Sequence, residues 1–491
     1  MGYYFISIGG SGAKVMESLI HLCAAGAMPN KRKQKDIYMM AIDPDRSNGN
    51  LTRSNKLLNS YCHFQKLNIG TETALLKTEI RQAEPFIWSP SEINSNLDNI
   101  LDYQVYQGQP IGDLYEALYT KDERHTNLNK GFRGRPSIGA AVMAKKVSLS
   151  NTGDEPWKTF ISTVNADVDN GKDVHIFIAG SIFGGTGAAG LPTIARLLRN
   201  QFTDASKVAI GGSFILPYFS FKSQVQEDGS IFADSENFIT NTKAAIKYYS
   251  VQDNPYNSMY FIGDNGNSSV EFSIGAIEQK NDANVVDFYG ALAALDFYSS
   301  AIEKLKPCSY ISRSDEAVYG WEDLPDLHMD NGDTVKLRHR MAQFTRFIFA
   351  YEHLVKPVIH KLSKGELPVY EYPWYVDHLD GINLETAEVR AFEEYTESYV
   401  RWLAQLEGRK DGRRVTYVDE DAFSVDKEIV INSSKFATCV DSTKVDLNEV
   451  WFRLSEGDCN DNKHYANKAY SGVNGFGKFL RLLYDSCESN R

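Results

Sequence analysis

A glycine-rich loop between an apolar run and a helical pattern constrains the fold of this chain more than any other feature. The apolar run covers residues 174–179, and residues 184–190 read Gly-Gly-Thr-Gly-Ala-Ala-Gly. A strand that turns into a helix through glycines presents bare backbone N–H groups at a helix N-terminus, where the helix dipole favours anions. The pattern predicts a phosphate-binding loop. The alternative is a glycine turn that only lets a helix pack closely on a sheet.

Short strand-like runs alternate with helical patterns through the first 300 residues. Strands are predicted at residues 3–8, 37–42, 174–179, 208–216 and 259–262. Helices are predicted at residues 15–24, 137–149, 191–199 and 237–249. This alternation predicts an α/β fold with a doubly wound, mostly parallel, Rossmann-like sheet. In such a sheet the loops after the strands line a ligand site at one edge.

A second glycine-rich turn follows the first predicted strand. It consists of Gly9, Gly10, Ser11, Gly12 and Ala13, followed by Lys14. Taken alone it fits the fingerprint of an NAD-dependent oxidoreductase, with Asp43 as the acid that contacts the ribose. That interpretation gives residues 184–190 no role, whereas a nucleotide with two or three phosphates would use both this loop and the loop of residues 9–14.

The order of strand, Gly-Gly-Thr-Gly loop and helix resembles the signature loop of the tubulin and FtsZ superfamily. The resemblance covers about residues 1–305 and implies a GTP-binding domain. In that domain the signature loop supplies nucleotide contacts from Gly184, Gly185, Thr186, Gly187 and Ala188. Residues 9–14 correspond to the family's first phosphate loop, and Asp43 to an acidic residue that holds Mg²⁺ through water. The resemblance therefore implies GTP or GDP and Mg²⁺ as cofactors.

A third loop, before a helix that Pro136 opens, resembles the family loop that senses the γ-phosphate. Its candidate ligands are Gly131, Arg133, Gly134 and Arg135. The two guanidinium groups add positive charge that suits phosphate oxygens. The alternative is a pair of solvated arginines.

The remaining candidate contacts surround the sugar and the base. Pro217 and Tyr218 resemble the family segment beside the ribose. Asn265 follows a predicted strand, and Asn284 lies early in a long central helix predicted over about residues 282–305. Both resemble asparagines that read the purine, because an amide donates and accepts hydrogen bonds at once. Each is equally consistent with an ordinary turn or helix cap.

The usual hydrolytic motif is missing after the central helix. In polymerising members of the superfamily this loop enters the nucleotide site of the next subunit and completes GTP hydrolysis in trans. The carboxylates available here as substitutes are Glu322, Asp323 and Asp326. GTPase activity is therefore a weaker expectation than GTP binding.

Two further departures concern the domain organisation. Residues 51–130 form a longer connection than the family expects, with helices predicted at residues 71–80 and 91–101, and so long a connection has structure or function of its own. Residues 306–491 are predicted to form a divergent, helix-rich C-terminal domain.

Composition limits the classes of partner. The chain has 491 residues and a net charge of −12 without a long basic run, which argues against a nucleic-acid surface. It shows neither a signal-peptide layout nor an apolar stretch of 18 residues, so a cytoplasmic protein without a membrane span is expected. The leading hypothesis is a bacterial tubulin- or FtsZ-like, cytoskeletal GTP-binding protein that assembles head-to-tail. Its alternatives are a non-polymerising GTP-dependent sensor that switches a partner protein, and the NAD-dependent oxidoreductase.

Overall fold

The chain divides into two units in the computed structural model. The first consists of Met1–Leu19, Asp36–Lys56 and Ile80–Asp315, and the second of Ile20–Lys35, Leu57–Glu79 and Glu316–Arg491. The structure describes residues 1–29, 36–67, 69, 75–91, 95–129, 131–132, 134–150, 155–220, 237–251, 253–264, 268–269, 281–311, 326–328, 334–406, 418, 422–425, 429–432, 435–436, 445–460 and 475–488.

A seven-stranded sheet with the order β3-β2-β1-β4-β5-β7-β9 organises the first unit. Its strands are β1 (Gly2–Ile8), β2 (Asp36–Ile42), β3 (Glu79–Trp88), β4 (Val174–Ser181), β5 (Val208–Ile215), β7 (Ser258–Ile262) and β9 (Cys308–Ile311). The neighbours from β2 to β9 all pair in parallel. The predicted α/β fold with a mostly parallel sheet is therefore confirmed, and each of the five predicted strands is present.

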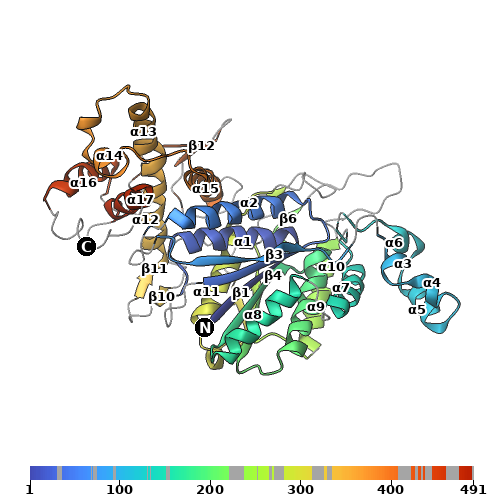
Figure 1. Ribbon diagram of the computed structural model, residues 1–491. Coiled ribbons are helices and arrows are strands. Elements are labelled where there is room, and N and C mark those ends of the chain that lie inside the picture. The colour runs from blue at the N-terminus through green and yellow to red at the C-terminus, as the bar shows by residue number, and fades with distance from the viewer. Residues whose placement is uncertain are drawn as a thin grey trace. The chain divides into compact units, whose positions relative to one another are not determined.

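Helices cover both faces of this sheet. They are α1 (Gly9–Ala24), α2 (Gly49–Phe64), α7 (Pro136–Ser150), α8 (Trp157–Asp169), α9 (Thr186–Gln201), α10 (Phe238–Val251) and α11 (Val285–Ser299). Figure 1 shows α7, α8, α9 and α10 on one side of the sheet and α1 on the other. Every residue of β1, β4 and β5 is buried, because a strand covered on both faces presents apolar side chains in both directions.

The predicted central helix corresponds to α11. It begins after Asn284, whose side chain accepts a hydrogen bond from the backbone of Val286, while Asp287 reaches back to the Asn284 N–H. This capping box fixes the start of the helix. Gly290 lies against Val15 of α1, since a Cβ there would come within 2.8 Å of the valine side chain. The helix is buried on nearly all sides, as its uninterrupted apolar character predicts.

In its described part, the long connection contains most of α2, one strand of the sheet and four short helices. Residue 79 begins β3, which forms the sheet edge, so the helix predicted to extend to residue 80 is wrong there. Pro85 is tolerated because an edge strand has backbone N–H groups without ladder partners. The helices are α3 (Leu97–Ile100), α4 (Tyr103–Tyr106), α5 (Pro110–Leu118) and α6 (Lys121–His125). A pair of two-residue strands, β6 (Phe219–Ser220) and β8 (Ser268–Ser269), completes the first unit.

The second unit is rich in helices, as predicted. They are α12 (Leu337–Ala350), α13 (Lys356–Ser363), α14 (Pro373–His378), α15 (Ala387–Leu403), α16 (Leu447–Asn460) and α17 (Gly475–Ser486). Two hairpins pair β10 (Asp326–His328) with β11 (Thr334–Lys336) and β12 (Phe423–Val425) with β13 (Ile429–Ile431). Aromatic rings fill its core. The Tyr395 hydroxyl and Nδ1 of His21 share a 3.0 Å hydrogen bond, and the Tyr395 ring packs edge-on against Phe64. Among the described helices, none combines the length and apolar character needed to cross a bilayer.

Candidate anion site at the centre of the sheet

The strand order reverses between β1 and β4, which are neighbours at the middle of the sheet. From β1 the chain proceeds outward through β2 to β3, and from β4 it proceeds the other way through β5 to β9. Ser7 pairs in register with Ala179, so β1 and β4 end beside each other. Ligands of open α/β sheets bind in the crevice beyond the carboxyl ends of two such strands.

Three glycine-containing loops meet at this point. A Cβ on Gly9 would lie 3.4 Å from the Cβ of Thr186, and a Cβ on Gly131 would lie 3.9 Å from the Thr186 hydroxyl. A Cβ on Gly185 would lie 2.9 Å from the backbone nitrogen of Gly134. The structure therefore brings together the stretches around residues 10, 134 and 186, which are far apart in the sequence.

Three helices begin in these loops. Helix α1 starts at Gly9, α9 at Thr186 and α7 at Pro136. The first N–H groups of a helix have no partner within the helix and carry the positive end of its dipole. Asn241 of α10 fastens two of the loops, because its side-chain amide donates to the carbonyl oxygens of Phe183, at 3.1 Å, and Gly134, at 3.4 Å. The resulting cradle is electrically suited to an anion.

The glycines of the cradle have different tasks. Gly9 and Gly131 have φ angles of +69° and +87°, which side chains rarely adopt. Gly12 and Gly187 are packing positions: a Cβ on Gly12 would overlap the carbonyl oxygen of Ala179, and one on Gly187 would come within 2.7 Å of the Ser181 nitrogen. The sequence analysis assigned all four glycines to the ligand and kept close helix–sheet packing as the alternative for the loop of residues 184–190. At Gly12 and Gly187 the structure shows such packing of α1 and α9 on the sheet. Ala13 is likewise buried, in the helix–sheet core.

The loop after β2 supplies a polar wall that the sequence analysis missed. Asn48 and Asn50 are buried, and a Cβ on Gly10 would touch their amide ends at 3.4 to 3.5 Å. The Asn48 side chain accepts hydrogen bonds from the backbone of Asn50, at 3.0 Å, and Leu51, at 3.2 Å. Asn50 donates to Asn281 just before α11. The usable signal was an Asn-x-Asn pattern at a helix start, three residues beyond Asp45.

Asp43 and Asp45 form a buried acidic pair at the end of β2. Each is 3 % exposed, and the Asp45 N–H donates to Asp43 Oδ1 at 3.0 Å. Burial raises the pKa of Asp43 to about 8, against the opposing effect of this backbone hydrogen bond. Carboxylate oxygens are hard ligands that suit Mg²⁺, which usually keeps water and phosphate as its other ligands. No group of three or more His, Cys, Asp or Glu side chains suited to a metal occurs within the described ranges. Two carboxylates are suited to a hard cation whose other ligands come from water or a bound anion.

Tyr218, whose ribose contact stays a prediction, is buried and hydrogen-bonded within the protein. Its ring is only 1 % exposed, and its hydroxyl accepts a hydrogen bond from Lys14 and lies 3.3 Å from both Asp287 carboxylate oxygens. Lys14 and Asp287 form an ion pair at 3.3 Å, and both are buried. Lys14, Tyr218 and Asp287 thus form a buried polar cluster beneath the cradle. Pro217, the residue before Tyr218, stays partly accessible.

Arg135 is committed to a protein carboxylate. Its guanidinium pairs with Glu123 of α6, a partner that the sequence did not indicate, and its contact with phosphate stays a prediction. Burial alone would raise the pKa of Glu123, but hydrogen bonds from Thr120 and the charge of Arg135 hold that pKa below its ordinary value. The loop also offers its backbone at Gly131 and Gly134.

The other predicted residues are capping, structural or outside the described ranges. Asn284 caps α11 through the 2.9 Å hydrogen bond that its Oδ1 accepts from Val286, which is the alternative considered for it. Asp326 begins β10, where it lies opposite Lys336. Arg133, Asn265, Glu322 and Asp323 lie outside the described residues. Ser11, Gly184 and Ala188 are partly accessible beside the cradle.

Comparison with known proteins decides the family. Residues 4–260, more than half of the chain, match the family model described as "Tubulin like". The chain belongs to the tubulin-like family. The matched segment of this tubulin-like chain contains β1, β4 and all three glycine loops, so the resemblance drawn from those loops is confirmed at the level of the family.

Three solved structures are similar to this tubulin-like chain at low identity. CetZ2 from Haloferax volcanii, a GTPγS-bound protofilament, is 14% identical with a TM-score of 0.30, over 61% of this chain and 59% of that one. CetZ from Methanosaeta thermophila is 10% identical with a TM-score of 0.23, over 54% and 46%. The TubZ-Bt two-stranded filament is 9% identical with a TM-score of 0.24, over 54% and 46%. The chain spans less than two thirds of the length of each. No curated protein matches the sequence.

Proposed function

We propose that the chain binds a guanine nucleotide in the cradle between β1 and β4 and assembles head-to-tail with copies of itself. The observation that carries the proposal is the meeting of the α1 and α9 N-termini at the point where the strand order reverses. Backbone N–H groups from two helix starts and a third loop supply more donors than one phosphate needs. A di- or triphosphate uses them all, whereas a Rossmann-type NAD site uses one such loop.

The acidic pair supplies the second half of the nucleotide site. Asp43 and Asp45 would hold Mg²⁺ through water, and the ion would neutralise phosphate charge. Binding would favour the ionised form of Asp43, because a nearby cation lowers the pKa of a carboxyl group. Membership of the tubulin-like family supports assembly between copies, with the nucleotide covered by the next subunit.

Nucleotide binding is tested at Thr186. A fluorescent GTP analogue should bind the unmodified chain in the presence of Mg²⁺, and the variant Thr186→Phe should lose at least about tenfold in affinity because the ring enters the cradle. Thr186 suits the test since its side chain is partly accessible, whereas a side chain at Gly187 would strike the backbone of Ser181. The matched control is Thr159→Phe, an exposed threonine on α8.

The identity of the base is tested by extracting the nucleotide that copurifies with the chain. We expect GTP or GDP on chromatography of the extract. Recovery of NAD would overturn the assignment, and equal affinity of the Thr186→Phe and Thr159→Phe variants would remove the cradle from the site.

A further inference from the structure

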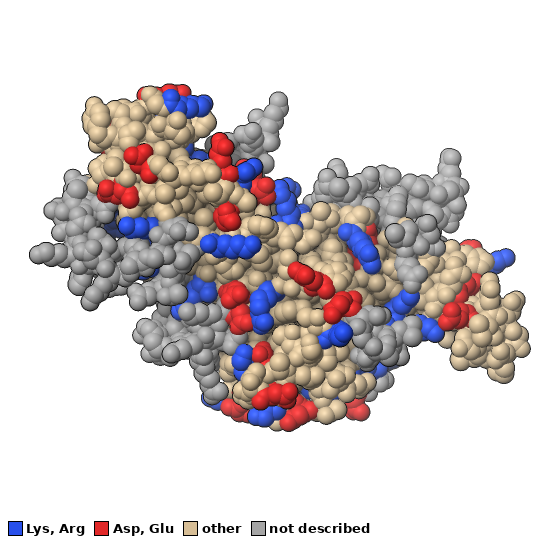
Figure 2. All heavy atoms as spheres, in the orientation of Figure 1, with Lys and Arg blue, Asp and Glu red and all other residues tan. Residues whose placement is uncertain are grey.

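Helices α4 and α5 display large apolar side chains to solvent. Five of these side chains are exposed: Val105 at 66%, Tyr106 at 39%, Ile111 at 59%, Leu114 at 56% and Leu118 at 63%. On α5 three of these follow the i, i+3, i+7 spacing of one helix face. Figure 2 shows the lobe of α4 and α5, at the right of the view, as a largely uncharged surface. A contiguous exposed apolar face of this kind marks an interaction surface.

The lobe is held firmly from beneath. Tyr115 of α5 donates a 2.8 Å hydrogen bond to Asp98 of α3, and the Arg124 guanidinium lies 4.7 Å from the centre of the Tyr103 ring. Lys145 of α7 pairs with Asp102 at 3.1 Å. These contacts fix the orientation of α5 and leave its apolar face outward.

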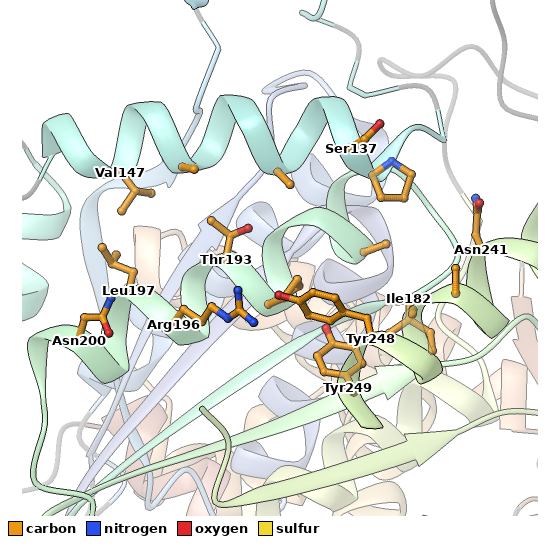
Figure 3. A pocket seen from close by; sticks show the side chains of 17 residues that line it. Ser137, Val147, Ile182, Thr193, Arg196, Leu197, Asn200, Asn241, Tyr248 and Tyr249 are labelled. Atoms are coloured by element: carbon orange, nitrogen blue, oxygen red, sulfur yellow. The ribbon is translucent and has the colours of Figure 1, made fainter. Parts of the chain in front are cut away.

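The same unit contains an apolar groove of about 770 Å³ between α7, α9 and α10. Val147, Leu197 and Tyr248 line it from the three helices (Figure 3). The Arg196 guanidinium lies 5.1 Å from the centre of the Tyr248 ring at the groove surface. The hydroxyl of Tyr249, a residue 9% exposed that also lines the groove, has no hydrogen-bond partner among the described residues.

The two surfaces carry opposite charges. Helices α9 and α10, which form two walls of the groove, contain no acidic residue, and Arg196, Lys243 and Lys247 give them positive charge. Helix α5 contains no basic residue and two exposed acidic ones, Asp113 and Glu116. An apolar helix with acidic flanks and an apolar groove with basic flanks are complementary in both respects.

We infer that α5 of one copy of this chain docks into the α7–α9–α10 groove of a second copy. Ile111, Leu114 and Leu118 enter the groove, and the acidic side chains beside them face Arg196 and Lys243. Helix-in-groove recognition uses this spacing of apolar anchors. Because the two surfaces differ, each copy keeps one of each free, and the contact generates rings or open chains rather than a closed dimer. The contact goes beyond the proposed nucleotide-dependent assembly, since neither surface contains the cradle of Gly9, Gly131 and Thr186.

Two surface variants test the contact without added nucleotide. Leu114→Asp places a charge on the apolar face of α5. Ala244 is an exposed residue that lines the groove, and Ala244→Asp places negative charge there. In sedimentation velocity at about 100 µM, a range that detects weak interfaces, the unmodified chain should associate. Each variant alone should weaken association at least about tenfold. An equimolar mixture should form a dimer and nothing larger. The intact α5 of the Ala244→Asp variant docks into the intact groove of the Leu114→Asp variant, and the two surfaces that remain are both altered.

The control is Val376→Asp, which adds the same charge at a 44% exposed apolar position on α14 of the second unit. It should associate as the unmodified chain does, and circular dichroism should show that all three variants remain folded. A monomeric unmodified chain, unchanged association of either groove or helix variant, or a mixture without dimer would each overturn the inference.

Discussion

At the scale of single residues, a buried ion pair lies beneath the cradle. Lys14 and Asp287 are an ion pair with 2% and 0% of the residue exposed, and the Tyr218 hydroxyl completes their hydrogen bonding. A buried pair of this kind adds little net stability compared with apolar residues, but removing one member leaves the other charge without compensation. The cluster joins the start of α1 to the start of α11. Loss of one of its charges would therefore also disturb the first glycine loop, which leads into α1.

The variant Lys14→Met tests this cluster. We expect it to lower the free energy of unfolding by about 3–5 kcal/mol, because Asp287 is left buried and uncompensated. The double variant Lys14→Met with Asp287→Asn should be less destabilised than the single one. Urea unfolding measures both, and a double variant that is the less stable of the two would contradict the explanation.

Asp43 gives the protein a pH dependence of known sign. Its folded pKa of about 8 lies above the value of about 4 expected in the unfolded chain. Between these values the unfolded chain has lost the proton that the folded chain keeps, so rising pH favours unfolding. The stabilisation from this group is complete below about pH 4 and is lost as pH rises through about 8, with a slope approaching about 1.4 kcal/mol per pH unit.

The variant Asp43→Asn should lack this contribution. Urea unfolding at several pH values between about 5 and 8 should show the free energy of unfolding falling more steeply with pH in the unmodified chain than in the variant. Parallel curves would show that Asp43 does not titrate in this range.

At the scale of elements, helix–sheet contact depends on particular glycines. In α1, a Cβ on Gly12 would overlap the backbone of β4 and approach Ser7 of β1, whereas the atoms nearest a Cβ on Gly10 are amide atoms of Asn48 and Asn50 at 3.4 to 3.5 Å. A methyl group added at Gly12 would therefore clash with backbone, whereas one added at Gly10 would contact two side chains. Sequence spacing alone did not distinguish them, because the distinction depends on which strand lies beneath the helix.

The matched variants Gly12→Ala and Gly10→Ala separate these roles. Gly12→Ala should destabilise the chain by about 1–3 kcal/mol, since α1 must move away from the sheet to admit the methyl group. Gly10→Ala should change the unfolding midpoint much less. Thermal or urea unfolding compares them, and equal losses would refute the assignment of Gly12 to packing.

At the scale of the whole molecule, the open question of function is whether nucleotide controls assembly. If the cradle is covered by the next subunit, sedimentation should show larger assemblies with GTP than with GDP, and Thr186→Phe should abolish the difference. An assembly state that is the same with both nucleotides would favour the alternative of a sensor that acts on a partner protein. The α5–groove contact is separable, because Leu114→Asp should leave the dependence on GTP in place.

The sequence by itself predicted five of the seven strands of the main sheet and left out the two edge strands, β3 and β9. Residues 174–179 and 208–216 were recognisable as strands because a strand buried on both faces must be apolar throughout. The glycine loops were recognisable because backbone donors at a helix start need side-chain-free residues. The strand β3 was missed because an edge strand buries only part of its surface and therefore has mixed composition.

Only the tertiary structure decided which residues of the site face each other. Arg135 pairs with Glu123, and Tyr218 turns to Lys14 and Asp287, although both looked like ligand contacts in the sequence. The physical reason is that local pattern reports the periodicity and propensity of a segment, while the partner of a charged or polar side chain depends on distant segments that the fold brings within hydrogen-bonding reach. For the same reason the apolar face of α5, with Asp113 and Glu116, and the basic groove became visible as complementary only once the helices were in place.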